Sequence, residues 1–296
     1  MTSIAFIGLG HMGGPMAVNL AKSGYAVRGC DLSEAALELA RSNGVPAFAP
    51  VTEAVTGAGI VITMLPAGRH VLSLWRELVE IVPPGTLLID CSTIDMDSAR
   101  KAHALAEAHG CPALDAPVSG GTGGAAAGTL TFMVGGDVQV FAQARPVFGA
   151  MGSRIIHCGE ASSGQAAKIC NNMILGVSMI AVGEAFVLGE RLGLSHQALF
   201  DAASVSSGQC WSLTTYCPVP GPVPASPANH GYEPGFMASL MLKDLTLSQA
   251  AAEETGAMTP LGAEATRLYR SFSEEGFGAR DFSAIIEMLR NRSADD

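Results

Sequence analysis

The chain has 296 residues, of which 48% are hydrophobic and 15% charged, and its formal net charge at pH 7 is −10. This length is sufficient for two domains or one large one, and a mean hydropathy of +0.32 indicates a large core with buried subunit contacts. The acidic balance argues against nucleic acids and anionic membranes as partners, because binding to either requires basic patches.

The cysteines and the first residues indicate the compartment. The seven cysteines are scattered and form no Cys-x-x-Cys pair, so we expect reduced thiols, no disulfide framework and no bound metal. The N-terminus enters a predicted strand with no basic segment before it, so we expect no signal peptide. Together these features predict a cytoplasmic protein.

The first predicted strand, residues 4–7, runs into a glycine-rich turn that precedes a helical pattern over residues 14–23. The turn reads Gly8-Leu9-Gly10-His11-Met12-Gly13. In a G-x-G-x-x-G turn the first glycine permits the tight bend, the second lets the backbone approach a pyrophosphate, and the third lets the helix pack closely on the strand. The phosphates then lie at the N-terminus of that helix. We therefore predict that these six residues bind a dinucleotide.

An acidic residue follows the second predicted strand, residues 26–30. Asp31 lies about 20 residues after the glycine turn, where a carboxylate can accept hydrogen bonds from the adenosine ribose hydroxyls. Its negative charge would repel the additional phosphate of NADP, so Asp31 favours NAD. Arg28 is close in sequence, but its mid-strand position points it elsewhere. A glycine turn without a ligand is the alternative, and the agreement of turn, strands and acid argues against it.

Short apolar runs and helical patterns continue to alternate through the first half of the chain. This alternation predicts a parallel sheet covered on both faces, that is, a doubly wound Rossmann-type α/β domain over residues 1–162. The further predicted strands cover residues 60–64, 87–90, 113–116 and 130–135, and the further predicted helices cover residues 34–42, 71–82 and 98–109.

Several loops leave the carboxyl ends of these strands, which is where α/β sheets bind ligands. The segments 64–66 and 90–93 should flank the adenosine and nicotinamide portions of the cofactor, unless they are ordinary turns with a Ser or Thr N-cap. In the segment 115–121, Ser119 and the N–H groups of Gly120 and Gly121 could form a nest for a carboxylate. The alternative there is a flexible loop, which the Gly- and Ala-rich residues 122–128 favour.

The pattern changes after residue 162, and no further strand is predicted. Residues 164–192 indicate one long helix that is apolar on most of its circumference and must be buried by other elements or by a partner subunit. Its uncharged stretch, residues 173–183, is too short to span a membrane. We predict an all-helical C-terminal domain over residues 163–296 and a homodimer or homotetramer. The further helices cover residues 196–203, 237–255, 261–274 and 283–290, and an ordered loop covers residues 217–234.

Lys168 is the strongest candidate for acid/base chemistry. It lies in the first turns of the long helix among small and apolar residues, and desolvation would lower its pKa from the usual value of about 10.4 towards neutrality. Asn172 lies four residues further on the same helix face, where it could bind a substrate hydroxyl or orient the ammonium group. The alternative is a lysine that extends to solvent beside a surface amide. Lys243, followed by Asp244, could reach the cofactor or form a surface ion pair.

These motifs together resemble the β-hydroxyacid dehydrogenase family, and most closely its 3-hydroxyisobutyrate dehydrogenase subgroup. The resemblance covers nearly the whole chain. It depends on four blocks in order, Gly8–Leu20, Asp115–Gly121, Gly164–Asn172 and Lys243–Leu245, with the subgroup suggested by residues 216–221 and 235–236.

The resemblance implies an NAD-dependent enzyme of valine catabolism that reversibly transfers a hydride between a small 3-hydroxy acid and the nicotinamide. It implies that Lys168 is the catalytic acid/base, that Asn172 assists it, and that Ser119, Gly120 and Gly121 bind the substrate carboxylate. Further cofactor contacts are implied for Leu65, Pro66, Thr93 and Lys243.

Three other functions stay open from the sequence. A relative could act on serine or tartronate semialdehyde, because the choice of substrate depends on a few pocket side chains, for which Trp211 and Tyr232 are candidates. A phosphorylated sugar acid is less consistent with the few clustered basic residues of the second domain. A dinucleotide-binding protein without catalysis would have no need of Lys168 with Asn172.

Overall fold

The computed structural model describes residues 2–292 of the chain. It divides into two compact units, Met1–Lys168 and Ile169–Asp296. The division falls inside the long helix α8 (Ser163–Arg191), six residues after the boundary expected at residue 162. The first turns of α8, including Lys168, therefore pack with the first unit.

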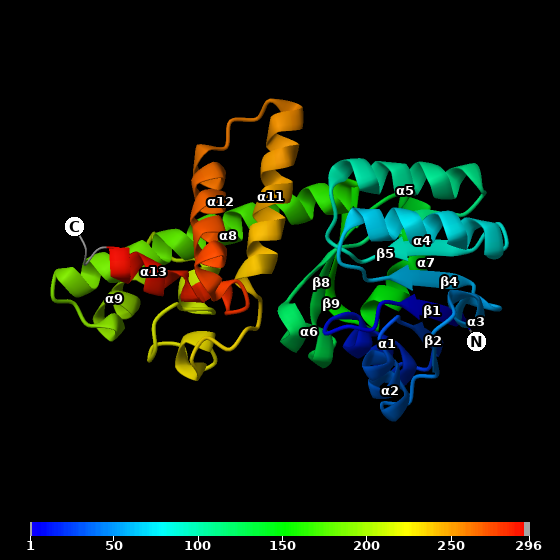
Figure 1. Cartoon of the computed structure of the whole chain (residues 1–296), viewed down its shortest axis with the longest axis horizontal. Helices are drawn as coiled ribbons and strands as arrows, with labels where there is room; N and C mark the ends of the chain where they lie inside the picture. The colour runs from blue at the N-terminus through cyan, green and yellow to red at the C-terminus, as the bar shows by residue number, and fades with distance from the viewer. Residues whose placement is uncertain (1, 293–296) are drawn as a thin grey trace. The chain divides into compact units, whose positions relative to one another are not determined.

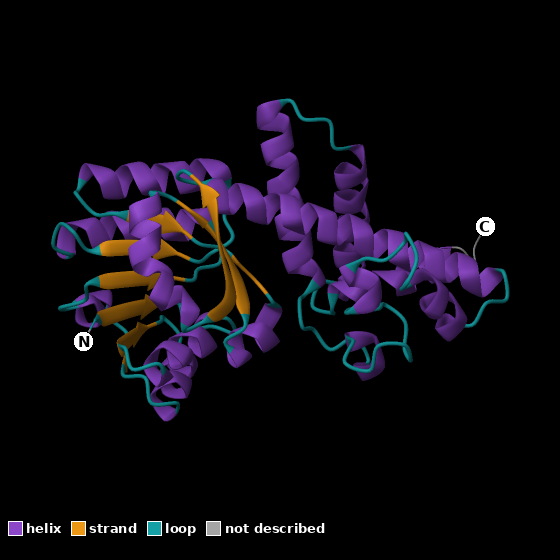
Figure 2. Cartoon of the chain, turned by 180° about the vertical axis from the view of Figure 1, so that it is seen from behind, coloured by secondary structure: helices purple, strands orange, loops and turns teal. Residues whose placement is uncertain are grey.

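The first unit is built on one sheet with the strand order β3-β2-β1-β4-β5-β6-β8-β7, and β9 pairs with β8 (Figures 1 and 2). The order 3-2-1-4-5-6 is that of a doubly wound dinucleotide-binding sheet. The strands are β1 (Ser3–Ile7), β2 (Ala26–Cys30), β3 (Ala47–Phe48), β4 (Ile60–Thr63), β5 (Leu87–Asp90), β6 (Ala113–Asp115), β7 (Val118–Ser119), β8 (Leu130–Gly135) and β9 (Gly152–Gly159).

Helices cover both faces of this sheet because successive strand residues point to opposite sides. Ile4 and Phe6 of β1 pack in a core with α1, α2, α6 and α7, whereas Ala5 and Ile7 pack in a second core with α3, α4 and α5. The predicted doubly wound fold is thus confirmed. The helices are α1 (Gly13–Lys22), α2 (Glu34–Ser42), α3 (Val51–Val55), α4 (Gly68–Ile81), α5 (Met96–Ala108), α6 (Gly121–Ala127) and α7 (Val138–Gly149).

The structure differs from the predicted parallel sheet at one edge. Strand β8 is antiparallel to both β6 and β7, while β8 and β9 are parallel. The Gly- and Ala-rich segment, for which a flexible loop was the alternative, is largely the helix α6. Its N-terminal turn begins beside Gly120, where φ is +135°, and it ends at Gly128 in a left-handed conformation, so the glycines bound the helix rather than prevent it.

The second unit has helices and loops but no β-strand among its described residues, which confirms the predicted class of this half. Its core combines aromatic and aliphatic side chains of several helices with those of the loop 217–234, which contributes Cys217 and Val219. Tyr232 donates a hydrogen bond to the Pro218 carbonyl, which helps to order this loop. The elements after α8 are α9 (His196–Ala203), α10 (Trp211–Thr214), η1 (Pro227–His230), α11 (Ala238–Thr255), α12 (Pro260–Phe272), η2 (Ser273–Phe277), η3 (Phe282–Ala284) and α13 (Ile285–Arg292).

One property of α8 corrects the sequence-based expectation about membranes. The uncharged stretch 173–183 is too short, but the complete helix is long and apolar enough to cross a membrane by length and composition. Half of its most apolar window is buried within the structure. Core helices of soluble proteins meet the same criterion, so the property is weak support for a membrane span.

Candidate active site

The three glycines of the first turn have different surroundings. Gly8 has a φ of +96°, and a Cβ there would lie 2.2 Å from the Met64 carbonyl oxygen. A Cβ on Gly13 would lie 1.9 Å from the Gly8 carbonyl oxygen, whereas a Cβ on Gly10 would have no atom within 4 Å. Gly8 and Gly13 are therefore required by the fold itself. Gly10 leaves open space beside the backbone, which fits the close approach of a pyrophosphate.

Asp31 lies beside this turn, immediately after β2. Its Oδ2 accepts a hydrogen bond of 2.7 Å from the Leu9 N–H, and its Oδ1 accepts one of 2.8 Å from the Ser33 N–H. The carboxylate is thus fixed next to the glycine turn, as a contact to the adenosine ribose requires. The guanidinium of Arg28 stacks on the Phe48 ring, with its Cζ 4.6 Å from the ring centre.

The loops after β4 and β5 are joined by a buried polar network. The Leu65 N–H donates to Ser92 Oγ at 2.8 Å, and the Ser92 hydroxyl donates to Asp90 Oδ1 at 2.6 Å. The Thr63 hydroxyl donates to the same Asp90 oxygen at 2.7 Å. Helix α5 is capped by Asp95, which accepts from the Ser98 N–H. The network therefore fixes the loops that carry Leu65, Pro66 and Thr93. Ser92 connects these loops, and the cap of helix α5 is a different residue, Asp95.

Replacing Asp90 with asparagine is expected to remove a loss of stability that the wild type undergoes as the pH rises from 4 to 7.5. Burial raises the pKa of Asp90 from an ordinary 3.8 to about 6, and the nearby Asp115 adds to the rise, whereas hydrogen bonds from Ser92 and Thr63 oppose it. Three hydrogen bonds reach Oδ1, and Oδ2 has no partner among the described residues, so asparagine keeps the same acceptor. Because the folded state binds the proton more tightly, the contribution of Asp90 to stability is present below pH 4 and is lost as the pH rises through 6.

The measurement is urea-induced unfolding of both proteins between pH 4 and 7.5. The free energy of unfolding of Asp90→Asn relative to the wild type should increase across this range by about 2 kcal/mol, since each pKa unit is worth about 1.4 kcal/mol and part of the effect lies below pH 4. A difference that is independent of pH would contradict the assignment of a buried, titrating carboxyl group.

Ser119, Gly120 and Gly121 lie at the junction of β7 and α6. Ser119 is half-buried, and the two glycines have positive φ values of +135° and +63°. Residues with a side chain rarely adopt such values, so this turn needs glycine at both positions. The turn follows directly from the end of β6, and it remains a predicted carboxylate-binding segment.

Lys168 is 7% exposed, which argues against a lysine that extends to solvent. The helix that carries it is fixed to the sheet by two buried side chains. Asp115 accepts hydrogen bonds from the Ser162 and Gln165 N–H groups, both at 2.8 Å. The Gln165 side chain donates to the Ser92 carbonyl at 2.7 Å and accepts from the Ile94 N–H at 3.1 Å. The structure thus joins the first turns of α8 to the predicted cofactor loop around Thr93.

Asn172 begins the next turn of the same helix and is 1% exposed. Its side-chain Nδ2 donates to Asp244 Oδ2, and its Oδ1 accepts from Asn171 Nδ2 at 2.9 Å. Asp244 is buried, and its Oδ1 lies 3.7 Å from the Lys243 ammonium. Lys243 and Asp244 are therefore more than a surface ion pair, because the carboxylate also fixes the orientation of the Asn172 amide.

The two candidate specificity residues have different environments. Trp211 is half-exposed and stacks on Tyr216 with ring centres 4.9 Å apart. Tyr232 is buried in the helical core with its hydroxyl bound to the backbone, so its role there is structural. Tyr232 as a pocket residue is thus not supported, and Trp211 stays a candidate.

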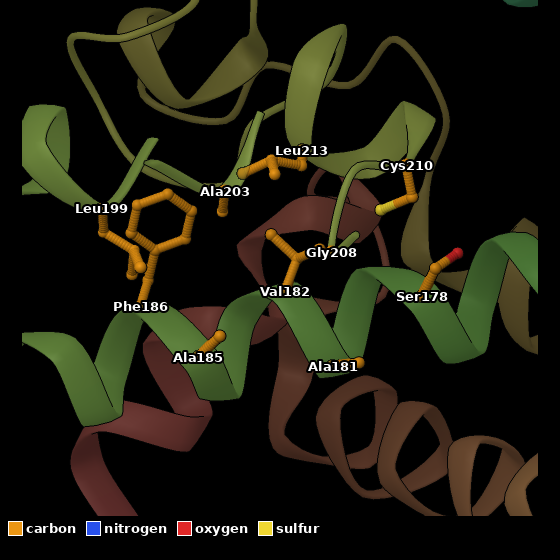
Figure 3. A pocket seen from close by; sticks show the side chains of 10 residues that line it. All are labelled: Ser178, Ala181, Val182, Ala185, Phe186, Leu199, Ala203, Gly208, Cys210 and Leu213. Atoms are coloured by element: carbon orange, nitrogen blue, oxygen red, sulfur yellow. The ribbon is translucent and has the colours of Figure 1, made fainter. Parts of the chain in front are cut away.

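A cavity of about 280 Å³ lies along α8 in the second unit. Figure 3 shows Phe186 and Leu199 towards one end and Cys210 and Ser178 towards the other. The lining is almost wholly apolar, and a hydroxy acid needs charged or hydrogen-bonding groups, so this cavity does not fit the substrate chemistry. Across residues 2–292, no group of three or more His, Cys, Asp or Glu side chains could hold a metal ion, and all seven cysteines are free.

Comparison with known families identifies both halves of the chain. Residues 3–159 match the family model for the NAD-binding domain of 6-phosphogluconate dehydrogenase, and residues 162–289 match that for the NAD-binding domain of NADP-dependent 3-hydroxyisobutyrate dehydrogenase. A probable 3-hydroxyisobutyrate dehydrogenase of Mycobacterium tuberculosis is 53% identical over 99% of both chains. The chain belongs to the 3-hydroxyisobutyrate dehydrogenase family.

One further relative and one solved structure are similar over the whole chain. An NAD-dependent L-serine dehydrogenase of Pseudomonas aeruginosa is 49% identical over 98% of both chains. The solved structure of the M. tuberculosis 3-hydroxyisobutyrate dehydrogenase with L-serine is 53% identical, covers 98% of this chain and 99% of that one, and has a TM-score of 0.94. The predicted family, enzyme class and nicotinamide cofactor are thereby confirmed. The roles of individual residues remain predictions.

Proposed function

We propose that the protein oxidises 3-hydroxyisobutyrate reversibly to methylmalonate semialdehyde with NAD. The observation that carries this proposal is the burial of Lys168 at the first turns of a helix that is hydrogen-bonded to a predicted cofactor loop. A buried amine next to a cofactor loop is suited to proton transfer, and family membership supplies the type of reaction.

Each group of site residues has a part in this reaction. When it is bound, the nicotinamide accepts the hydride from the carbinol carbon. Neutral Lys168 takes the proton of the substrate hydroxyl, and in the reverse direction its ammonium returns that proton to the aldehyde oxygen. Asn172, oriented by Asp244, positions the hydroxyl. Ser119 and its two following glycines bind the carboxylate.

The remaining site residues hold the cofactor. Residues 8–13 receive the pyrophosphate, Asp31 binds the adenosine ribose, and Leu65, Pro66 and Thr93 line the cofactor from the loops after β4 and β5. The ammonium group of Lys243 contributes a positive charge to the binding of the cofactor. The open space beside Gly10 and the fixed Asp31 carboxylate support this arrangement.

Asp31 is expected to set the preference for NAD over NADP. In Asp31→Asn the charge that repels the additional phosphate is removed, so the ratio of kcat/KM for NAD to that for NADP should fall by about tenfold, or ~1.4 kcal/mol. The substitution also removes one acceptor from the Leu9 or Ser33 N–H, which should cost about 1 kcal/mol of stability. Steady-state rates with both cofactors provide the measurement. An unchanged ratio would mean that another residue selects the cofactor.

L-Serine is the second candidate substrate, because a relative of 49% identity is an L-serine dehydrogenase and the M. tuberculosis relative was solved with L-serine. Both substrates are small 3-hydroxy acids, and they differ at the carbon next to the carboxylate, which carries a methyl group in one and an amine in the other. An absorbance assay at 340 nm with 3-hydroxyisobutyrate, L-serine and tartronate semialdehyde separates the candidates. We expect the highest kcat/KM with 3-hydroxyisobutyrate, and a protein inactive with every substrate would refute the proposed function.

A homodimer or homotetramer is the proposed assembly. On α8, Ile174 is 66% exposed and Leu188 59% exposed, and Ala181 and Ala185 between them are also exposed. These positions form an apolar stripe along a helix, of the kind that subunit contacts cover. Sedimentation should therefore show an oligomer, and Ile174→Lys with Leu188→Lys should weaken it, whereas Leu39→Lys, an exposed leucine of α2, should not. A wild-type protein that sediments only as a monomer would contradict the assembly.

The proposed compartment is the cytoplasm, where free thiols stay reduced. The proposed reaction also gives the protein a role in valine catabolism.

A further inference from the structure

The side chain of Gln165 pairs with the backbone on both sides of Thr93. Its Nε2 donates to the Ser92 carbonyl at 2.7 Å, and its Oε1 accepts from the Ile94 N–H at 3.1 Å. The residue is 0% exposed, so both contacts are shielded from water. At neutral pH the side-chain amide of glutamine offers a donor and an acceptor side by side for such a pairing, whereas a carboxylate has only acceptors.

The start of helix α8, which carries Gln165, is also fixed to the sheet by hydrogen bonds and close contacts. Asp115, at the end of β6, accepts hydrogen bonds from the Gln165 and Ser162 N–H groups and contacts His103 Nε2 at 2.9 Å. A Cβ on Gly164 would lie 2.4 Å from the Met133 carbonyl oxygen, so the helix is also in close contact with β8. These contacts leave the first turn of α8 little freedom to shift against the sheet.

Lys168 lies three residues after Gln165, one turn along the same helix face. Resting on the proposed function, we propose that Gln165 is a positioning residue for the reaction. Its amide fixes the distance between the Lys168 amine and the Thr93 loop that lines the cofactor. Gln165 does not touch substrate, and it acts through the residues on each side of it.

The physical reason is the short range of proton transfer. The nitrogen of a general base must lie about 3 Å from the oxygen that carries the proton, and a displacement of about 1 Å can cost 100-fold in rate. The two hydrogen bonds of Gln165 link the element that carries the base to the element that lines the cofactor. Loss of both would let the two elements move apart without removing any reacting group.

Gln165→Met, which retains the size of the side chain but makes neither hydrogen bond, is the first test. We expect kcat with 3-hydroxyisobutyrate to fall by about 10- to 100-fold, with KM and the NAD dissociation constant from calorimetry changed by less than about threefold. The deuterium isotope effect with substrate labelled at the carbinol carbon should rise, because hydride transfer becomes rate-limiting. The matched control is Phe148→Leu, which loosens the core of the same unit and should leave kcat and the isotope effect at their wild-type values.

A second readout needs neither cofactor nor turnover. The rate at which an amine-acylating reagent modifies Lys168 in the protein without cofactor, followed by peptide mass spectrometry from pH 6 to 10, reports the surroundings of the amine. We expect the profile of Gln165→Met to differ from that of the wild type and that of Phe148→Leu to coincide with it. The acylation profile can be measured even if the wild type is inactive with every hydroxy acid. Inactivity would refute the proposed function, whereas coinciding acylation profiles of Gln165→Met and the wild type would contradict this inference.

Gln165→Glu is a conservative substitution that should restore both hydrogen bonds when the carboxyl group is protonated. It also tests the inference if Gln165→Met does not fold. A protonated glutamic acid has a donor and an acceptor side by side, as glutamine has, whereas the carboxylate has only acceptors. The ratio of kcat for Gln165→Glu to that of the wild type should therefore rise as the pH falls. The inference is overturned if Gln165→Met retains the wild-type kcat, isotope effect and acylation profile, or if the Gln165→Glu ratio is independent of pH.

Discussion

Lys168→Ala is expected to lower kcat by about 10²- to 10⁴-fold, the usual contribution of a positioned general acid/base. The lysine is buried at the first turns of α8, and it is the predicted acid/base of the site. The dissociation constant of NAD should change little, because the predicted cofactor contacts lie on other loops. Lys168→Met should lose activity to a similar degree, since it preserves the volume and removes the amine.

Stopped-flow absorbance at 340 nm gives kcat and single-turnover rates, and calorimetry gives the affinity for NAD. The matched control is Lys101→Ala, since Lys101 is an exposed lysine of α5 paired with Asp97. It should retain wild-type turnover. If Lys168→Ala turned over 3-hydroxyisobutyrate at the wild-type rate, Lys168 would not be the acid/base.

Gly10→Ala and Gly13→Ala are expected to separate cofactor binding from folding. A methyl group on Gly10 has no atom within 4 Å, so stability should stay within about 0.5 kcal/mol of the wild type. The same methyl group occupies the space reserved for the pyrophosphate, so the affinity for NAD should fall by at least about tenfold. On Gly13 the methyl group would lie 1.9 Å from the Gly8 carbonyl oxygen, and overpacking of this kind costs about 1–3 kcal/mol or more.

Thermal unfolding without cofactor and calorimetric titration with NAD measure the two effects. The expected pattern is a normal midpoint with weak NAD binding for Gly10→Ala, and a lowered midpoint for Gly13→Ala. If Gly10→Ala bound NAD as tightly as the wild type, the pyrophosphate would not lie at this turn.

The sequence pattern predicts the fold well where the strands are buried on both faces. Strands β2, β5 and β8 begin and end at the predicted residues, because each is a short run of mostly apolar residues between turn signals. Strand β9 was missed since Gly152–Gly159 is only partly buried and carries polar side chains, so it has no apolar run. Helix α7 was missed as well, and its Pro146 is one reason, because proline usually marks a helix end.

Within the candidate site, local motifs were predictable and their supports were not. The glycine turn, Asp31 and the pair Lys168 and Asn172 follow from spacing along one strand or helix. Gln165 and Asp244 have partners about 70 residues away in the sequence, and no spacing rule connects such positions. Their signal is the burial of a polar side chain, which becomes visible only once the chain is folded.

The continuity of the first unit into α8 also determines how this chain can be dissected. The sequence pattern predicts a domain boundary at residue 162, but a fragment that ends there would lack Gln165. The Ser92 carbonyl and the Ile94 N–H would then lose their partner, and Asp115 would lose one of its donors. Truncation would also expose these groups and the surface that the helix covers to water, so the fragment would lose the stabilisation that these hydrogen bonds and this burial contribute. The dinucleotide-binding half is therefore best isolated with the first turns of the long helix attached, through Lys168 or beyond.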